Sequence, residues 1–352
     1  MRRRRMGVIP MDSHLPKVNP NLHVPKDHSP IIEEIQGLIK VFKDGHVERL
    51  PVMPEVPPSW SSNHDVLSKD IVLHPSTSLW SRFYIPMHHL HHHHQLPLLV
   101  YFHGGGFCIG SAAWKCYHEF LSRLALETTS IILSVNYRLS PEHRLPAAYE
   151  DGLTAVKWLR SKASSEDHAL FLSHCDLSNV YLAGDSAGGA IAYHVVTQLG
   201  NNNGNMIIKG VILIQPFFGG EERTNSETMS LEQPMKSALS LPTSDAYWRL
   251  SLPPGTDRNH LWCNPFGRGA PKVDDPQMKI PSMLVCVAEL DILKDRNLGF
   301  CMALRMAGKK VELKVYNGVG HAFQILHQYS HVSQARTLEM INDIKNFIFS
   351  TR

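Results

Sequence analysis

Residues 184–188 read Gly184-Asp185-Ser186-Ala187-Gly188, between an apolar run at 180–183 and a helix-like segment at 188–199. A serine flanked by small residues in a tight strand-to-helix turn is pushed out of its sheet. The helix N-terminus behind it favours developing negative charge. These five residues would also suit a plain glycine-rich turn with a capping serine, so the reading of Ser186 as a nucleophile depends on its surroundings.

The flanking sequence alternates between short apolar runs and longer helical patterns. Strands are expected at residues 97–102, 130–136, 180–184, 209–215, 282–288 and 311–316. Helices are expected at residues 117–126, 149–160, 188–199, 297–307 and 333–349. Buried β-branched runs that alternate with helices predict an α/β fold with a mostly parallel central sheet and helices on both faces. Sites in such folds lie at the carboxyl ends of the strands.

A glycine-rich loop, His103-Gly104-Gly105-Gly106, follows the first of these strands. Such a loop leaves backbone N–H groups uncovered, and together with the amide of Ala187 they would form an oxyanion hole. The rival interpretation is a phosphate-binding loop. It is disfavoured because no Gly-Lys-Ser or Gly-Lys-Thr follows.

A serine hydroxyl needs a neutral imidazole to take its proton and a carboxylate to orient that imidazole. His321 follows the strand at 311–316, and Asp291 follows the strand at 282–288. The chain order Ser186, Asp291, His321 is the order expected for this kind of fold. Glu289 and Asp295 compete for the acidic role. We expect Glu289 to lie inside the strand end and Asp295 to cap the following helix.

Taken together, these motifs make the chain resemble the plant carboxylesterases of the hormone-sensitive-lipase-like branch of the α/β-hydrolase superfamily. The resemblance covers roughly residues 31–349. It is carried by His103-Gly104-Gly105-Gly106-Phe107, Tyr137-Arg138-Leu139-Ser140-Pro141-Glu142-His143, Gly184-Asp185-Ser186-Ala187-Gly188-Gly189, Asp291-Ile292-Leu293-Lys294-Asp295 and Gly320-His321-Ala322-Phe323. A subgroup is marked by Phe217-Phe218-Gly219-Gly220-Glu221-Glu222-Arg223-Thr224.

The resemblance implies a carboxylic-ester hydrolase with an α/β-hydrolase fold and a lid. Ser186 would attack the acyl carbon of a small, fairly apolar ester, with His321 as general base and then acid, and Asp291 holding the imidazole. The amides of Gly105, Gly106 and Ala187 would accept the oxyanion, while His103 and Gly104 shape the loop.

Relatives that lack esterase activity supply two alternatives. One is a non-catalytic small-molecule receptor such as the gibberellin receptors, in which the histidine of the triad is replaced. The other is a dehydratase or a cyclase, whose routes often alter the nucleophile or the triad. Since Ser186, Asp291 and His321 are all present, hydrolysis is favoured. The expected reaction needs no cofactor and no metal.

The remaining segments yield expectations about organisation. Residues 1–30 are expected to be a disordered extension, and residues 31–352 one hydrolase domain with lid elements at about 31–60 and 217–275. Apolar residues at helical spacing predict an amphipathic helix over 31–42. The tract at His88, His89 and 91–94 is expected to be an exposed hairpin loop. Five aromatic residues could line the pocket or pack in the core: Trp114, Tyr117, Tyr247, Trp248 and Phe323.

Composition argues against several classes of partner and location. The formal net charge of +3 comprises +4 in residues 1–30 and −1 in the rest, so the folded part is near neutral and unlike a nucleic-acid surface. No apolar run approaches the roughly 20 residues needed to span a bilayer. Six cysteines without a Cys-x-x-Cys pair indicate small buried thiols. These features favour a cytoplasmic, or also nuclear, protein, and they carry no information on oligomeric state.

Overall fold

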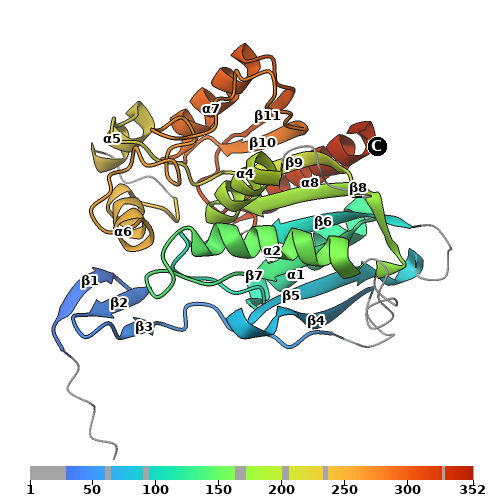
Figure 1. Ribbon diagram of the computed structural model, residues 1–352, viewed down its shortest axis with the longest axis horizontal. Helices are drawn as coiled ribbons and strands as arrows, with labels where there is room; N and C mark the ends of the chain where they lie inside the picture. Colours follow the sequence, from blue (N-terminus) through green and yellow to red (C-terminus); the bar gives the residue numbers. More distant parts are fainter. Residues whose placement is uncertain are drawn as a thin grey trace, which may run out of the picture.

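The computed structural model describes residues 29–59, 65–89, 95–162, 172–199, 206–232, 237–326 and 330–351. Figure 1 shows a large twisted sheet with helices on both faces and further elements beyond one end of the sheet. The expected disordered extension lies outside the described residues except for Ser29 and Pro30.

The central sheet has eight strands in the order β11-β10-β9-β8-β6-β7-β5-β4. Within it, β5 runs antiparallel to both of its neighbours, β4 and β7, and the pairs from β7 through to β11 are parallel. The bounds are β4 (Val66–His74), β5 (Leu79–Pro86), β6 (Leu96–Phe102), β7 (Ile131–Asn136), β8 (Cys175–Asp185), β9 (Ile208–Ile214), β10 (Ser282–Ala288) and β11 (Val311–Tyr316). The expected mostly parallel sheet is confirmed, and β4 is a strand that the sequence did not indicate.

Central strands of this sheet are buried on both faces, which explains why β6 and β10 are continuous apolar runs, whereas the edge strands β4 and β11 are partly exposed. Successive side chains of a strand point to opposite faces. On β6, Leu98 and Val100 join one core cluster, whereas Leu99 and Tyr101 join the other. The sheet therefore separates two cores, and each needs its own cover of helices.

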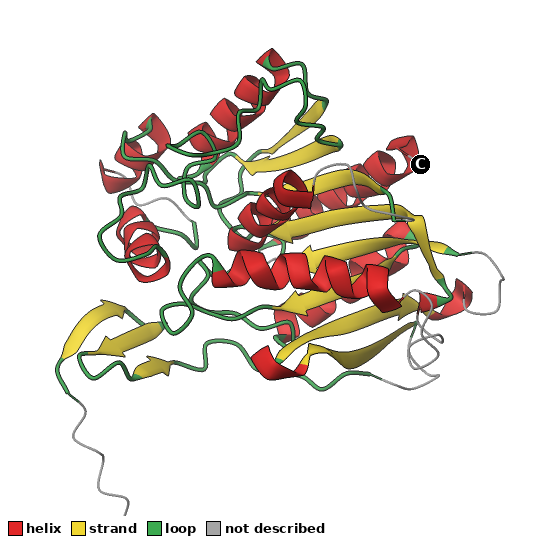
Figure 2. Cartoon of the chain, viewed as in Figure 1, coloured by secondary structure: helices red, strands yellow, loops and turns green. Residues whose placement is uncertain are grey.

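Five helices supply that cover, as the cartoon in Figure 2 shows. Their bounds are α1 (Lys115–Thr128), α2 (Ala147–Lys162), α4 (Ala187–Leu199), α7 (Lys294–Met306) and α8 (His331–Thr351). Buried residues of α2, α4 and α7 belong to one core cluster, and those of α1 and α8 to the other. All five agree with the helices expected from the sequence to within a few residues.

The prediction of an amphipathic helix over residues 31–42 is wrong. The segment forms β1 (Ile31–Ile35) and β2 (Ile39–Phe42), which pair antiparallel and, with β3 (Val47–Arg49), make a separate three-stranded sheet. The turn between β1 and β2 contains Gly37 at φ 75°, a left-handed conformation that suits glycine and ends a helix. The buried residues Ile35 and Ile39 fit the i, i+4 spacing of a helix face, and they also pair across the two strands of the hairpin.

A second group of elements interrupts the alternation between β9 and β10. It contains α5 (Asn225–Glu232) and α6 (Leu241–Ser251). Thr224 and Glu227 begin α5 with a capping box: the Thr224 N–H donates to the Glu227 carboxylate, and the Glu227 N–H donates to the Thr224 hydroxyl. In Figure 1, α5, α6 and the sheet β1-β3 all lie beyond the same end of the central sheet.

The histidine-rich connection is not a hairpin. It leads from β5 to β6, but β7 lies between these two strands in the sheet, so the chain crosses over instead of pairing back on itself. His88 and His89 fall in the short 3-10 helix Met87–His89. Residues 90–94, which hold the rest of the tract, lie outside the described residues.

Candidate active site

Ser186 occupies a strained turn between β8 and α4. Its φ of 53° is left-handed, a conformation that costs energy for any residue with a Cβ and is kept only where the surroundings enforce it. The Ser186 N–H donates to the Ile214 carbonyl at 2.9 Å, and the Ser186 carbonyl accepts from the N–H groups of Ala190 and Phe217. A Cβ on Gly188 would lie 1.9 Å from the Phe102 carbonyl oxygen, so this position requires glycine. The turn therefore presents the hydroxyl at the carboxyl end of the sheet.

Three side chains distant in sequence meet at that end. His321 Nε2 lies 2.9 Å from Ser186 Oγ, and His321 Nδ1 lies 2.7 Å from Asp291 Oδ2. Asp291 and His321 follow the neighbouring parallel strands β10 and β11, which brings their loops together. The other Asp291 oxygen accepts from the Leu293 N–H at 3.0 Å. The predicted Ser186, Asp291 and His321 are therefore in hydrogen-bond contact as a relay.

Burial and charge act on His321 in opposite directions. Burial lowers its pKa because it disfavours the imidazolium, but the Asp291 carboxylate, through its charge and hydrogen bond, and the Asp185 carboxylate raise it more. The net pKa is raised from its ordinary value. A base of this kind holds a proton more readily than a free imidazole.

Two residues that sequence reasoning missed hold the His321 backbone. The His321 N–H donates to Ser237 Oγ at 3.0 Å, and the Ala322 N–H donates to Gln215 Oε1 at 2.7 Å. Gln215 directly follows β9, and Ser237 lies in the segment between α5 and α6. No local motif marks either residue, since each acts on a histidine about 80 to 110 residues away in the chain.

The two acidic competitors have other partners. Glu289 is exposed, one residue beyond β10, and accepts from the Gly318 N–H at 2.8 Å. Asp295 lies in the first turn of α7, but it accepts from the Ser226 N–H at 2.8 Å, so it caps α5. The expectation that Asp295 caps its own helix is therefore wrong. The carboxylate of a residue in a first helical turn can accept from any unpaired backbone N–H that packs against it. Here the tertiary structure places the start of α5 next to Asp295.

In the glycine-rich loop the N–H groups divide into two sets. The Gly104 N–H donates to Tyr117 Oη at 2.7 Å and to Asp185 Oδ1 at 3.1 Å, so it is committed inside the protein. The N–H groups of Gly105, Gly106 and Ala187 have no hydrogen-bond acceptor among the residues that the structure describes. These three amides, and not that of Gly104, are free to bind a ligand oxygen.

His103 is fully buried and stacks on Tyr137, with ring centroids 4.3 Å apart. Burial lowers its pKa to about 4, so the ring is neutral at pH 7. Tyr137 Oη donates to the His103 carbonyl at 2.8 Å. These contacts fix the start of the glycine-rich loop and leave His103 no access to a substrate.

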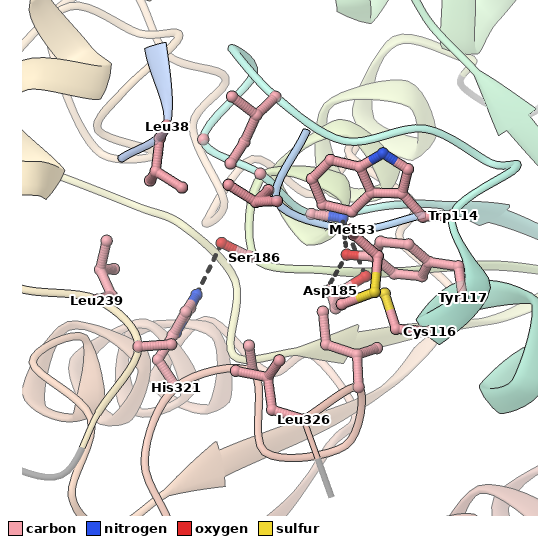
Figure 3. A pocket seen from close by; sticks show the side chains of 18 of the residues that line it. Leu38, Met53, Trp114, Cys116, Tyr117, Asp185, Ser186, Leu239, His321 and Leu326 are labelled. Carbon is pink, nitrogen blue, oxygen red and sulfur yellow. Dashed lines mark hydrogen bonds between the residues drawn. The ribbon is translucent and has the colours of Figure 1, made fainter. Parts of the chain in front are cut away.

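An apolar pocket opens beside Ser186 (Figure 3). Its cavity volume is about 230 Å³, which is enough for a small organic molecule. In Figure 3, Ser186 and His321 point toward one another, and Leu38, Leu239 and Leu326 surround them. The wall also includes Val52, Met53, Ile109, Trp114, Cys116, Tyr117, Phe217, Ala238, Tyr247, Ala322 and Ile325. Both segments expected to form a lid, 31–60 and 217–275, thus contribute side chains to the wall.

Of the five candidate aromatic residues, three line this pocket, namely Trp114, Tyr117 and Tyr247. The other two are core residues. Trp248 stacks on Phe217 with ring centroids 4.5 Å apart, and Phe323 packs against Tyr316. Among the described residues, no three His, Cys, Asp or Glu side chains come together in a metal-binding cluster. No described helix is both long and apolar enough to cross a membrane.

Comparison with known proteins agrees with this geometry. The model of a family described as having the alpha/beta hydrolase fold matches residues 99–325, a span that contains Ser186, Asp291 and His321. The chain belongs to this α/β-hydrolase family. The order of the three residues and the position of each after a parallel strand are those of the fold.

Relatives of this α/β-hydrolase include named plant enzymes. It is 45% identical over 338 residues to probable carboxylesterase 6 of Arabidopsis thaliana, with 96% of each chain covered. It is 33% identical to a 2-hydroxyisoflavanone dehydratase of Glycine max, over 90% of this chain and 98% of the relative. Among solved structures it is similar to an esterase of the archaeon Pyrobaculum calidifontis, at 26% identity and a TM-score of 0.66, covering 81% and 86% of the two chains.

Proposed function

We propose that this protein is a carboxylesterase that hydrolyses small, apolar carboxylic esters through a covalent acyl-enzyme. The observation that carries the proposal is the continuous relay from Asp291 through His321 to Ser186, with its hydroxyl beside an open pocket. The 45% identity to a probable carboxylesterase and the similarity to solved esterases support the same activity.

The geometry gives each residue of the relay one role. As Ser186 Oγ bonds to the acyl carbon, its proton passes to His321 Nε2, and the carbonyl π electrons move to the carbonyl oxygen. Collapse of that tetrahedral intermediate breaks the ester C–O bond, and His321 returns the proton to the leaving alcohol. Water then repeats the sequence on the acyl-enzyme, releasing the acid and restoring Ser186. Asp291 keeps Nδ1 protonated and stabilises the imidazolium.

Stabilisation of the oxyanion is assigned to the amides of Gly105, Gly106 and Ala187. Two observations support this assignment. The three N–H groups have no acceptor among the described residues, and Gly105 and Gly106 lie with Ser186 on the pocket wall while Ala187 begins α4. Each such donor is typically worth about 10²–10³ in rate. His103 and Gly104 belong to the same loop but hold its shape, because their polar groups are turned inward.

The preference for uncharged, apolar esters follows from the residues that form the pocket wall. Among the described residues of the wall, Asp185 is the one charged side chain apart from His321, and its carboxylate is engaged by protein donors. A charged acyl group would lose its hydration there without gaining a partner. We also propose a cytoplasmic location, supported by six cysteines that are all buried.

Covalent labelling tests the proposal directly. A fluorophosphonate probe should label the wild-type protein, and Ser186→Ala should lose both the label and the hydrolysis of p-nitrophenyl acetate and butyrate. Absence of labelling in a folded wild-type protein would instead support a receptor that binds a ligand without turnover. Circular dichroism establishes that both proteins are folded.

Elimination of water is the second candidate, because two dehydratases are among the relatives at 33% and 34% identity. Ester hydrolysis and dehydration can be measured side by side with purified protein. If 2-hydroxyisoflavanones lose water while simple esters stay intact, the dehydratase assignment replaces the esterase. Hydrolysis of esters without dehydration favours the first proposal.

A further inference from the structure

Asp185, the residue before the nucleophile, is a buried carboxylate with an unusually complete set of donors. Its side chain is 2% exposed. Oδ1 accepts from Tyr101 Oη at 2.7 Å and from the Gly104 N–H at 3.1 Å. Oδ2 accepts from Tyr117 Oη at 3.0 Å and from Gln324 Nε2 at 3.3 Å. These four donors match the roughly four acceptor positions of an ionised carboxylate.

The four donors come from four separate parts of the chain around the site. Tyr101 is the next-to-last residue of β6, and Gly104 belongs to the glycine-rich loop that follows. Tyr117 lies on α1, and Gln324 lies three residues after His321. Tyr117 Oη makes a second link, since it accepts from the Gly104 N–H at 2.7 Å while donating to Asp185. Figure 3 shows Asp185 and Tyr117 joined beside Ser186.

We infer that Asp185, with Tyr117, is a positioning residue that fixes the glycine-rich loop against the serine turn and so aims the amides of Gly105 and Gly106 at the oxyanion. This inference rests on the proposed esterase function. Gly104 is the point of attachment: a Cβ built there would lie 2.7 Å from Asp185 Oδ2 and 3.1 Å from Ser186 Cβ. The loop and the turn are therefore in direct contact, and the carboxylate links them.

The free-energy cost of burying the Asp185 carboxylate supports a role beyond packing. Burial raises the pKa of Asp185 to about 6, so the group is ionised at pH 7 without a cationic partner among its hydrogen bonds. A neutral apolar side chain would avoid that desolvation. Only an acceptor with several lone pairs can hold the Gly104 N–H and the Tyr117 hydroxyl in place together.

Asp185→Asn removes this capacity with little change in shape. An amide has one acceptor oxygen and a donor NH₂, so donors from the protein face its nitrogen. We expect kcat to fall about 10²-fold while KM changes by less than about threefold, because the loss concerns the transition state. Tyr117→Phe removes one link to Gly104 and should lower kcat about tenfold with the same pattern.

A readout specific to the oxyanion separates positioning from a merely structural role. An alkyl trifluoromethyl ketone reacts reversibly with Ser186 to form a hemiketal. In that adduct the former ketone oxygen carries the negative charge. Its inhibition constant should rise in parallel with the fall in kcat for Asp185→Asn and Tyr117→Phe. The matched control is Tyr181→Phe, which removes a buried tyrosine hydroxyl from the same strand, where it donates to the Ile348 carbonyl away from the site.

The outcomes distinguish this inference from the proposed function. If the wild type is active and Asp185→Asn and Tyr117→Phe keep kcat and ketone affinity within about twofold, the positioning role is refuted while the esterase stands. The same holds if Tyr181→Phe lowers ketone affinity equally. If Asp185→Asn does not fold, Tyr117→Phe decides alone. A wild type without hydrolysis or fluorophosphonate labelling would refute the proposed function itself.

Discussion

Asp291 Oδ2 lies 2.7 Å from Nδ1 of His321, and both residues are buried at the ends of neighbouring parallel strands. This contact determines the tautomer of the ring: with Nδ1 protonated toward the carboxylate, Nε2 presents its lone pair to Ser186 Oγ at 2.9 Å. The relay therefore depends on a pair of loops held in register by the sheet.

Asp291→Asn should lower kcat by about 10⁴ because an amide no longer selects this tautomer or stabilises the imidazolium. KM for a p-nitrophenyl ester should change much less. Steady-state kinetics measure both, with Glu289→Gln as the matched control because that carboxylate binds the Gly318 N–H at the surface. An equal loss in both variants would argue against Asp291 as the orienting acid.

The pH profile of kcat/KM should report the raised pKa of His321. Burial lowers that pKa, but Asp291 and Asp185 raise it by more, so the neutral base is lost as the pH falls through a midpoint above about 6.5. Activity should increase with pH up to a plateau. A midpoint below about pH 6 with a substrate that does not titrate would contradict this electrostatic balance.

Asp185 should add a second step to the acid limb. With its pKa raised to about 6, it takes up a proton below the His321 midpoint and loses acceptor capacity for Gly104 and Tyr117. The slope of log(kcat/KM) against pH should therefore steepen from about 1 toward about 2 below pH 6. In Asp185→Asn the slope should stay near 1, and a second step that persists there would have another origin.

Gly105→Ala should abolish most activity. Gly105 has φ 118°, and an added Cβ would lie 2.1 Å from the Ile109 carbonyl oxygen, so the loop must shift. We expect kcat to fall by about 10²–10³. Gly299→Ala is the control: this exposed helical glycine has no atom within 4 Å of the added Cβ. It should keep kcat and raise the unfolding free energy by about 0.5–1 kcal/mol, as thermal unfolding can measure.

Arg49 should hold the N-terminal sheet over the pocket. Its guanidinium donates to the carbonyl oxygens of Cys108 and Ser140 at 2.6 and 2.8 Å and to both oxygens of Glu142. Arg49→Ala should speed amide hydrogen exchange in β1–β3 by about tenfold or more, since charged hydrogen bonds contribute roughly 1.5–3 kcal/mol.

KM should also rise in Arg49→Ala, because Leu38 and Met53 form part of the pocket wall. The control is Lys40→Ala, which removes an exposed pair with Glu48 at 3.8 Å and should change neither quantity. If exchange in β1–β3 and KM are unchanged in Arg49→Ala, these contacts do not hold the sheet.

Much of the candidate site was accessible from sequence because its residues follow strands. Ser186 comes directly after β8, Asp291 lies three residues after β10 and His321 five residues after β11, and parallel strands end at one edge. The same reasoning failed for residues 31–42. Isoleucine spacing there fits a helix face and a hairpin face equally, and the turn at Gly37 decides between them.

Residue pattern alone determined the α/β alternation, the strained serine turn and the identity of the three relay residues, because these depend on local periodicity and on short motifs. Only the tertiary structure decided which polar groups support them. Asp185 holding Gly104, Ser237 and Gln215 holding the His321 loop, and Asp295 capping α5 are contacts between segments dozens of residues apart. These polar side chains form hydrogen bonds with the backbone N–H groups that tertiary packing places next to them. No local pattern in a single sequence shows which segments will be neighbours.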